Sequence, residues 1–235
     1  MTLSARFFRW HRWLGYVVAL QVLAWVAGGA VFAWLPFQGW VKAAEQVGRP
    51  VPALGAGWAQ RLARGLAQEP QADEALLSAQ SVATARGTAW RLRGAGGERW
   101  VDADGRALAP PDAAAVSAFA QSLYKGDGRL AGVETLATVP TRLGLVQELG
   151  GSRPVWRVRF DDALQTRLYV DSRSGELLAV RNEAWVWYDF FWRLHVMDYG
   201  GGEDFNNTLL RACATLALGL VATGLVLMTL ALRRA

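Results

Sequence analysis

The only two histidines of this 235-residue chain, His11 and His195, are the side chains best suited to carry chemistry. Each precedes a long uncharged stretch: His11 lies in the run FFRWHRWLG, and His195 lies in the run FWRLHVMDYG. Imidazole is a common ligand of transition metals and an axial ligand of haem iron. The single cysteine, Cys213, excludes a disulfide within one chain and a cysteine-based zinc or iron–sulfur site. The expected chemistry is therefore metal ligation by His11 and His195.

Two apolar stretches, residues 14–35 and about 212–232, must position these histidines. A helix needs about 20 apolar residues to cross the hydrocarbon core of a bilayer, and each stretch supplies them without a charge. A cleavable signal peptide is the alternative for the first stretch, but its apolar part exceeds the usual length of about 7 to 15 residues. We therefore predict a cytoplasmic N-terminus and first transmembrane helix in residues 1–37, and a second transmembrane helix with a short cytoplasmic tail in residues 208–235.

Charge separates the membrane flanks from the segment between them. Nineteen of the 25 Lys and Arg residues and all 20 Asp and Glu residues lie between residues 36 and 207, which leaves that segment at −1. The other six basic residues flank the apolar stretches: Arg6, Arg9, Arg12, Arg211, Arg233 and Arg234. This pattern speaks against a nucleic-acid-binding surface. By the positive-inside rule it predicts that both termini are cytoplasmic and that the middle segment lies outside.

The middle segment, residues 38–182, is expected to fold as an α+β domain of two tandem units, about 50–110 and 111–182. In each unit, apolar residues alternate with arginine along a hairpin. Each hairpin ends in Val-Asp, followed by a glycine turn and a third short strand. We expect the strand arginines to form a solvated face.

Helices and interfacial segments complete the expected architecture. A helix is predicted ahead of each hairpin, at residues 57–67 and 111–124. Residues 183–207 begin with a strongly aromatic run, which we expect to lie at the outer membrane interface. The predicted fold class is thus a membrane protein with two transmembrane helices and an extracytoplasmic α+β domain of two helix-and-antiparallel-sheet units.

Several of these segments resemble a known family. The second hairpin, residues 155–177, resembles the closing hairpin of PepSY domains. The runs HRWLG at 11–15, LH at 194–195 and ATGL at 222–225 resemble the PepSY-associated transmembrane family, and the resemblance covers most of the chain. It implies a protein of the bacterial inner membrane, with a periplasmic central domain, linked to iron and siderophore uptake.

The resemblance also implies a cofactor. Larger members of the family, with more spans, are similar to b-haem ferric-siderophore reductases, in which histidines at the start of membrane helices are the expected haem ligands. By motif, that role carries over to His11 and His195 and to no other residue of this chain. The chain departs from the larger pattern in having two spans and two histidines, and no GxGxxG motif for a flavin or nicotinamide follows a strand.

One chain is not expected to clamp one haem with both histidines, because His11 and His195 lie at opposite ends of a hydrocarbon core of about 30 Å. A second ligand would come from a symmetric copy or a membrane partner, or the haem would be five-coordinate. We expect one stripe of the first helix to support a close approach at His11: positions 11, 15, 18, 22, 25 and 29, at 3.6 residues per turn. The structural alternatives are an interfacial packing anchor for His11, and for His195 a hydrogen bond to Asp198 or to a backbone carbonyl.

Two functions are open at this point. The first is a haem-b electron-transfer component, or a subunit of one, linked to the reduction of ferric siderophores. The second is a non-catalytic, membrane-anchored module whose outer domain binds or regulates a periplasmic partner protein, since residues 38–182 contain no His and no Cys. We favour the first, without assigning an enzymatic activity to the chain alone. A transporter is disfavoured because two spans without an intramembrane charge build no pathway.

Overall fold

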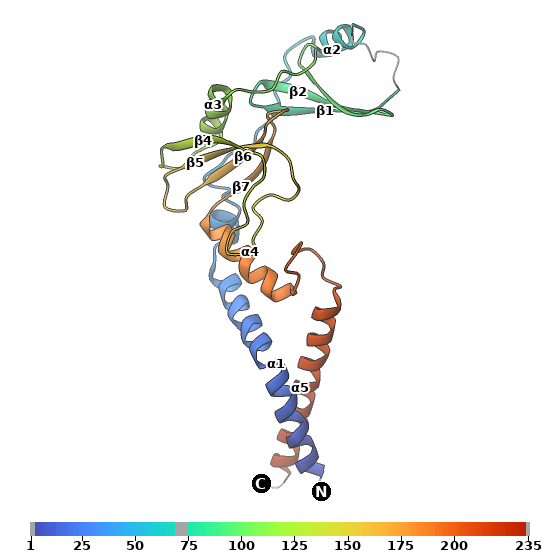
Figure 1. The fold of residues 1–235 in the computed structure, drawn as a ribbon, viewed down its shortest axis with the longest axis vertical. Coiled ribbons are helices and arrows are strands. Elements are labelled where there is room, and N and C mark those ends of the chain that lie inside the picture. Colours follow the sequence, from blue (N-terminus) through green and yellow to red (C-terminus); the bar gives the residue numbers. More distant parts are fainter. Residues whose placement is uncertain (1–2, 69–74, 234–235) are drawn as a thin grey trace. The chain divides into compact units, whose positions relative to one another are not determined.

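The computed structural model describes residues 3–68 and 75–233, and the chain divides into two compact units. The first, here the helical unit, comprises Met1–Leu35, Leu143–Val146 and Trp187–Ala235. The second, the sheet unit, comprises Pro36–Arg142 and Gln147–Val186. The two ends of the chain therefore belong to one unit, and most of the middle belongs to the other (Figure 1).

The helical unit contains two helices long and apolar enough to cross a membrane, α1 (Leu3–Trp34) and α5 (Thr208–Leu232). Their most apolar windows have mean hydropathies of 1.9 and 2.2. Large apolar side chains stay exposed on both helices, as at Trp34 of α1 (89 %) and Leu218 of α5 (70 %). A bilayer is the environment that accepts such surface, so the two predicted spans are confirmed.

The structure defines the ends of both spanning helices. Helix α1 begins at Leu3, so that Arg6, Arg9 and Arg12 belong to the helix and do not merely precede it. Helix α5 begins after Asn207, whose side chain accepts a hydrogen bond from the backbone N–H of Leu210 at 2.8 Å. Of the predicted basic tail, Arg233 caps α5 and Arg234 lies outside the described residues.

A third helix, α4 (Glu183–Val196), contributes its residues from Trp187 onward to the helical unit, where they pack on α1. Gly28 of α1 is buried, and a Cβ built there would lie 3.7 Å from the carbonyl oxygen of Phe191. Four residues further along α1, the ring of Phe32 lies 4.8 Å from the ring of Tyr188, centroid to centroid. The aromatic run thus forms a helix, and its rings pack against aromatic side chains of the first span.

Asp198 closes the loop that follows α4. Its carboxylate accepts hydrogen bonds from four backbone N–H groups, those of Gly200, Gly201, Glu203 and Asp204. The bond from Asp204 has the largest effect. Together the four bonds favour the charged form and lower the pKa of Asp198 to about 2.

The sheet unit holds two antiparallel sheets, each preceded by a helix. The first sheet has the order β1-β2-β3 and follows α2: α2 (Trp58–Leu66), β1 (Leu76–Thr84), β2 (Gly87–Gly94) and β3 (Gly97–Asp102). The second has the order β4-β5-β6-β7 and follows α3: α3 (Ala113–Leu123), β4 (Leu130–Leu136), β5 (Val155–Phe160), β6 (Arg167–Asp171) and β7 (Leu177–Arg181). A short π-helix, η1 (Phe37–Val41), begins the unit. The predicted fold class is confirmed.

Both predicted hairpins are present, with additional strands beside them. Trp90 pairs with Val101 across β2 and β3, and Trp156 pairs with Val170 across β5 and β6. The hairpin pattern does not predict β1 and β4, which pair with β2 and β5 as edge strands. In the predicted tandem unit of about residues 50–110, the expected third strand is reduced to an isolated bridge between Val101 and Ala107.

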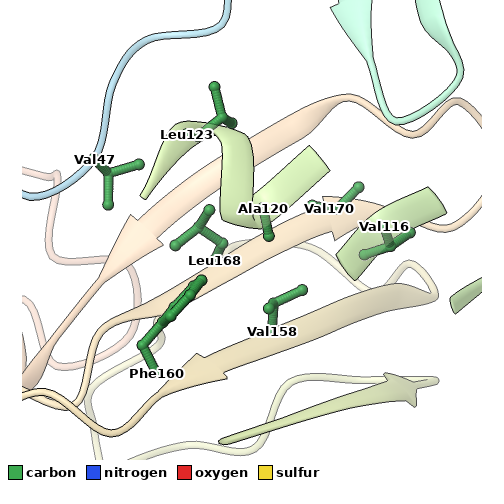
Figure 2. Close-up of a cluster of buried hydrophobic side chains, with 8 residues drawn as sticks. All are labelled: Val47, Val116, Ala120, Leu123, Val158, Phe160, Leu168 and Val170. Atoms are coloured by element: carbon green, nitrogen blue, oxygen red, sulfur yellow. The ribbon is translucent and has the colours of Figure 1, made fainter. Parts of the chain in front are cut away.

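The main core of the sheet unit lies between α3 and the four-stranded sheet (Figure 2). Apolar residues recur at helical spacing on α3 and alternate along β5. Leu168 and Val170 of β6 face this core, while Tyr169 is buried on the opposite face of β6. The buried members are Val47, Val116, Ala120, Leu123, Val158, Phe160, Leu168 and Val170. Helix α3 is fixed at its start by Asp112, whose side chain accepts the backbone N–H of Ala115 at 2.8 Å.

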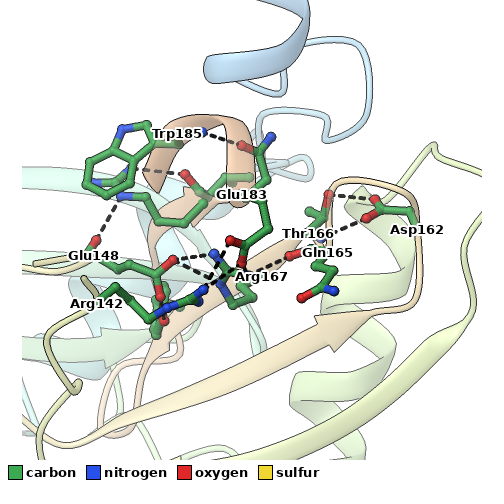
Figure 3. Close-up of polar contacts among 12 residues, drawn as sticks. Arg142, Glu148, Asp162, Gln165, Thr166, Arg167, Glu183 and Trp185 are labelled. Atoms are coloured by element: carbon green, nitrogen blue, oxygen red, sulfur yellow. Dashed lines mark hydrogen bonds and ion pairs between the residues drawn. The ribbon is translucent and has the colours of Figure 1, made fainter. Parts of the chain in front are cut away.

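The prediction of a solvated arginine face is wrong for Arg167 on β6, which is 4 % exposed (Figure 3). Its Nε donates to Oε1 of Glu148 at 2.9 Å, and its Nη1 donates to Oε1 of Glu183 at 2.8 Å. Glu148, itself 1 % exposed, also accepts the hydroxyl of Tyr169 at 2.6 Å. Burial, reinforced by Glu148, raises the pKa of Tyr169. A guanidinium can be buried here because two carboxylates satisfy it.

Candidate functional site

His11 is held between the two spanning helices. Its Nδ1 lies 3.1 Å from the carbonyl oxygen of Leu220 and 3.1 Å from the hydroxyl oxygen of Thr223, both on α5. A carbonyl only accepts, so the bond to Leu220 places the proton on Nδ1 and leaves Nε2 of the neutral ring with its lone pair. Gly224 makes this approach feasible, because a Cβ built there would lie 3.2 Å from Cε1 of His11.

The hydrogen bond to Leu220 orients the His11 ring in the way that metal-binding histidines are oriented. Metal-binding imidazoles generally donate their other ring N–H to a carbonyl or carboxylate, which fixes the tautomer and the ring plane. His11 has that second bond already, to a backbone carbonyl in an apolar setting. The ring is half-buried. Because Nδ1 is taken by the carbonyl of Leu220, Nε2 is the nitrogen with which the ring would meet a metal.

His195 lies in a different environment, among aromatic rings of α1 and α4. Its ring centroid is 6.0 Å from those of Trp25 and Phe32. It is 6.3 Å from the centroid of Trp192, and the planes of these two rings are nearly parallel. Its Nδ1 is buried and has no hydrogen-bond partner among the described residues. Nδ1 of His195 therefore does not make the alternative bond to Asp198 or to a carbonyl. The carboxylate of Asp198 instead accepts the backbone N–H groups of the loop after α4.

Within the helical unit, His11 and His195 lie at widely separated levels of α1. His11 itself stands in the first turns of α1, whereas His195 packs on Trp25 and Phe32 of the same helix. Fourteen residues separate positions 11 and 25, which is about 21 Å of helix at 1.5 Å per residue. The structure does not bring the two predicted site residues together, in keeping with the expectation that one chain cannot clamp one haem with both.

The packing face of α1 includes His11, Gly15, Val18 and Trp25 of the expected stripe, but it departs from the stripe at Gly29 and is nearer to a heptad there. Gly29 of that stripe is exposed, and a Cβ added to it meets no described atom within 4 Å, whereas Gly28 is buried against Phe191. The residues of α1 that face α4 or α5 include His11, Leu14, Gly15, Val18, Gln21, Trp25, Gly28 and Phe32. A spacing alternating between three and four keeps one seam in contact as helices wind around each other, so the period is nearer 3.5.

Three side chains that the sequence did not single out as site residues cap the C-terminus of α4. The carbonyl oxygens of residues 194, 195 and 196 accept, in turn, from Gln21 Nε2 at 3.1 Å, Trp25 Nε1 at 2.8 Å and Asn207 Nδ2 at 2.9 Å. The last carbonyls of a helix have no partner within it, and in an apolar setting each one left bare is costly. These caps fix the segment that carries His195. The one available signal was Gln21, the most polar residue of its apolar stretch.

The described residues offer no ready-made metal centre. Within residues 3–68 and 75–233, no three His, Cys, Asp or Glu side chains gather where a metal ion could be held. His11 offers Nε2 of an oriented ring, and His195 has a buried ring nitrogen, Nδ1, without a partner among the described residues. The two together do not fit one haem within one chain.

Polar side chains of the sheet unit are committed to structure. Tyr124 donates to Oδ2 of Asp162 at 2.8 Å, and the hydroxyl of Thr166 donates to the same carboxylate at 2.6 Å. Burial, together with the bond to Asp162, raises the pKa of Tyr124 to about 12. Groups fixed in this way hold loops together and offer no general acid or base near neutral pH.

Comparison with known proteins gives one match. The family model described as PepSY-associated TM region matches residues 8–235, which include both histidines, α5, nearly all of α1 and the entire sheet unit. No curated protein and no solved structure matches the chain.

Proposed function

This chain belongs to the PepSY-associated TM region family, and on that premise we propose that it is a membrane electron-transfer component that holds a b-type haem through His11. When bound, the haem would supply one-electron chemistry at its iron. A second copy of the chain, or a partner subunit, would supply a second ligand. The physiological role is reduction of ferric siderophores during iron uptake.

The single observation that carries the proposal is the hydrogen bond from Nδ1 of His11 to the carbonyl of Leu220. It orients the imidazole, and it leaves Nε2 as the ligating atom. Thr223 and Gly224 add to the arrangement, since the hydroxyl of Thr223 contacts Nδ1 and the missing side chain of Gly224 admits the ring.

His195 is the candidate for a second haem at the other end of the helical unit. Its buried Nδ1 lacks a hydrogen-bond partner among the described residues, which is costly unless something binds there. Flat aromatic rings surround it, and Gln21, Trp25 and Asn207 hold its segment in place. A site at each end would shorten the distance over which electrons pass through the membrane.

The proposed orientation has both termini in the cytoplasm and the sheet unit in the periplasm, in a bacterial inner membrane. Its support is the charge distribution: the first 35 residues contain Arg6, Arg9 and Arg12 and no acidic residue, and Arg233 ends α5. Short basic flanks are retained on the cytoplasmic side. Electrons would then travel outward, from His11 toward the side of His195.

The second candidate function is a non-catalytic module in which the helices anchor a partner-binding sheet unit. One observation favours it: Glu148 and Arg167 of that unit are buried and paired with one another, and Glu148 also accepts the hydroxyl of Tyr169. This candidate requires no haem. It predicts that partner binding survives replacement of both histidines.

Titration of haem into the purified chain in detergent micelles separates the two candidates. We expect a Soret band that saturates, and His11→Ala should remove the bound form assigned to that site. Thr223→Val should weaken haem binding about tenfold or more, as loss of a hydrogen-bond partner of a ligating histidine does. Thr229→Val is the matched control, because the hydroxyl of Thr229 is exposed and bonds only within α5.

Circular dichroism on every variant shows that the helices are retained. A wild-type protein that folds but binds no haem, alone or with co-purified membrane partners, would favour the anchored module. Binding that is equal in wild type and His11→Ala would contradict the assignment of the ligand.

A further inference from the structure

A cavity of about 460 Å³ lies where α1 begins and α5 approaches its end. It is separate from the contacts of His11 with Leu220, Thr223 and Gly224. Its lining comes from two helices: Ser4, Ala5, Phe8, Arg9 and Arg12 of α1, and Leu227 of α5. The proposed haem function makes no use of these residues.

The lining combines positive charge with an apolar wall. Arg9 and Arg12 are three residues apart on α1, so their guanidinium groups project from one side of the helix. The guanidinium of Arg12 lies 6.0 Å from the centroid of the Phe8 ring, a cation–π arrangement that steers it along the cavity wall. Phe8, Ala5 and Leu227 supply the apolar part.

The charged side chains of the two spanning helices are all basic. The sequence contains no Asp or Glu before Glu45 and none after Asp204, so neither spanning helix carries an acidic side chain. Guanidinium groups match the geometry of phosphate oxygens and bind them in a bidentate fashion. The complementary ligand is therefore an anion, and the most suitable anion has an apolar part that covers Phe8 and Leu227.

We propose that this cavity binds the phosphate of an anionic phospholipid through Arg9 and Arg12, with an acyl chain lying against Phe8 and Leu227. The position suits such a ligand, because the ends of spanning helices lie at the level of the lipid headgroups. Basic pockets between membrane helices are recognised sites for anionic headgroups. The site adds a defined lipid contact to the general attraction between basic flanks and an anionic leaflet.

The experiment compares lipid binding by the full chain, delipidated in detergent, using native mass spectrometry with phosphatidylglycerol and with phosphatidylcholine. We expect phosphatidylglycerol to bind more tightly. Arg12→Gln should weaken its binding about fivefold, in line with about 1 kcal/mol for a basic residue near the membrane surface. Arg6→Gln is the matched control, since Arg6 is an exposed arginine of the same helix that does not line the cavity.

A second variant, Ala5→Leu, fills the cavity without changing the charge and should also weaken binding of phosphatidylglycerol. Inorganic phosphate serves as a competitor that lacks acyl chains, and we expect it not to displace the lipid at millimolar concentration. Equal weakening by Arg6→Gln and Arg12→Gln would overturn the proposal in favour of diffuse surface charge. Displacement by phosphate would overturn it in favour of a simple anion site.

Discussion

Nδ1 of His11 and the hydroxyl of Thr223 lie 3.1 Å apart and join the first spanning helix to the last. The residues are 212 positions apart in sequence. Thr223 is buried; its hydroxyl accepts from Nδ1 of His11 and donates within α5, to the carbonyl of Leu220 at 2.9 Å. The helix pair is therefore locked at the same place where the proposed ligand is oriented.

Loss of the Thr223 hydroxyl should loosen the helix pair. We expect Thr223→Val to lower the free energy of unfolding in micelles by about 1 kcal/mol, the usual magnitude for one interhelical hydrogen bond in a membrane protein. Thr229→Val removes a hydroxyl that bonds only to Val226 of its own helix and should leave stability nearly unchanged. Unfolding by denaturing detergent, followed by tryptophan fluorescence, measures both variants. Equal loss in the two would contradict the role of the His11–Thr223 contact.

A side chain at Gly224 should push His11 away from α5. Because a Cβ there would already lie 3.2 Å from Cε1 of His11, Gly224→Leu should cost about 1–3 kcal/mol, as overpacking generally does. Gly29→Leu tests the same exchange at a glycine whose added Cβ meets no described atom within 4 Å. We expect that variant to be as stable as the wild type, measured in the same unfolding experiment. A tolerated leucine at 224 would show that the close approach of His11 is dispensable.

The loop closed by Asp198 should open in acid. The pKa of this carboxyl is lowered from 3.8 to about 2, so its contribution to stability is complete above about pH 4 and is lost as the pH falls toward 2. Hydrogen exchange at the amides of Gly200, Gly201 and Glu203, corrected for intrinsic rates, should therefore accelerate over that range. In Asp198→Asn, protection should be low already at pH 6 and should change little with pH.

Glu203→Gln is the control for this loop, since only the backbone N–H of Glu203, and not its side chain, bonds to Asp198. It should reproduce the wild-type exchange profile. A wild-type loop that stays protected at pH 2 would refute the assignment.

Removal of the buried charge at position 148 should unfold the sheet unit more readily. Glu148→Gln leaves Arg167 with Glu183 as its remaining charged partner, and disruption of a buried ion pair costs about 3–5 kcal/mol. Glu134→Gln disrupts a more exposed pair with Arg157 and should cost at most about 1 kcal/mol. Thermal melting of the two variants gives the comparison. Similar melting temperatures would mean that Arg167 finds another partner or reaches water.

The apolar stretches and the two hairpins could be predicted because each depends on a local pattern. Twenty uncharged residues in a row, or arginines alternating with apolar residues up to a glycine turn, fix an element without reference to the rest of the chain. Trp90 and Val101 pair as that pattern requires. Edge strands β1 and β4 lack it, since an edge strand with mixed burial shows no clear alternation.

The site could be predicted in its residues but not in its contacts. His11 and His195 stand out by type and position, yet nothing in the sequence pairs Gln21 or Trp25 with the carbonyls at the end of α4. The shift from Gly29 to Gly28 has a similar origin, because helices that wind around a common axis change the effective period of the contact face. Arg167 looked like its exposed neighbours on the strands, and only the fold places Glu148 and Glu183 beside it.

The most direct test of the central claim is a dithionite-reduced minus oxidised absorbance spectrum of the chain purified from cells supplied with haem, recorded beside His11→Ala. If His11 holds a haem, we expect a Soret band and a sharp α band in the wild type, and the signal of the His11 site should be missing from the variant. Retention of both bands at full intensity in His11→Ala would contradict ligation by His11. A flat spectrum from folded wild-type protein would contradict haem binding by this chain.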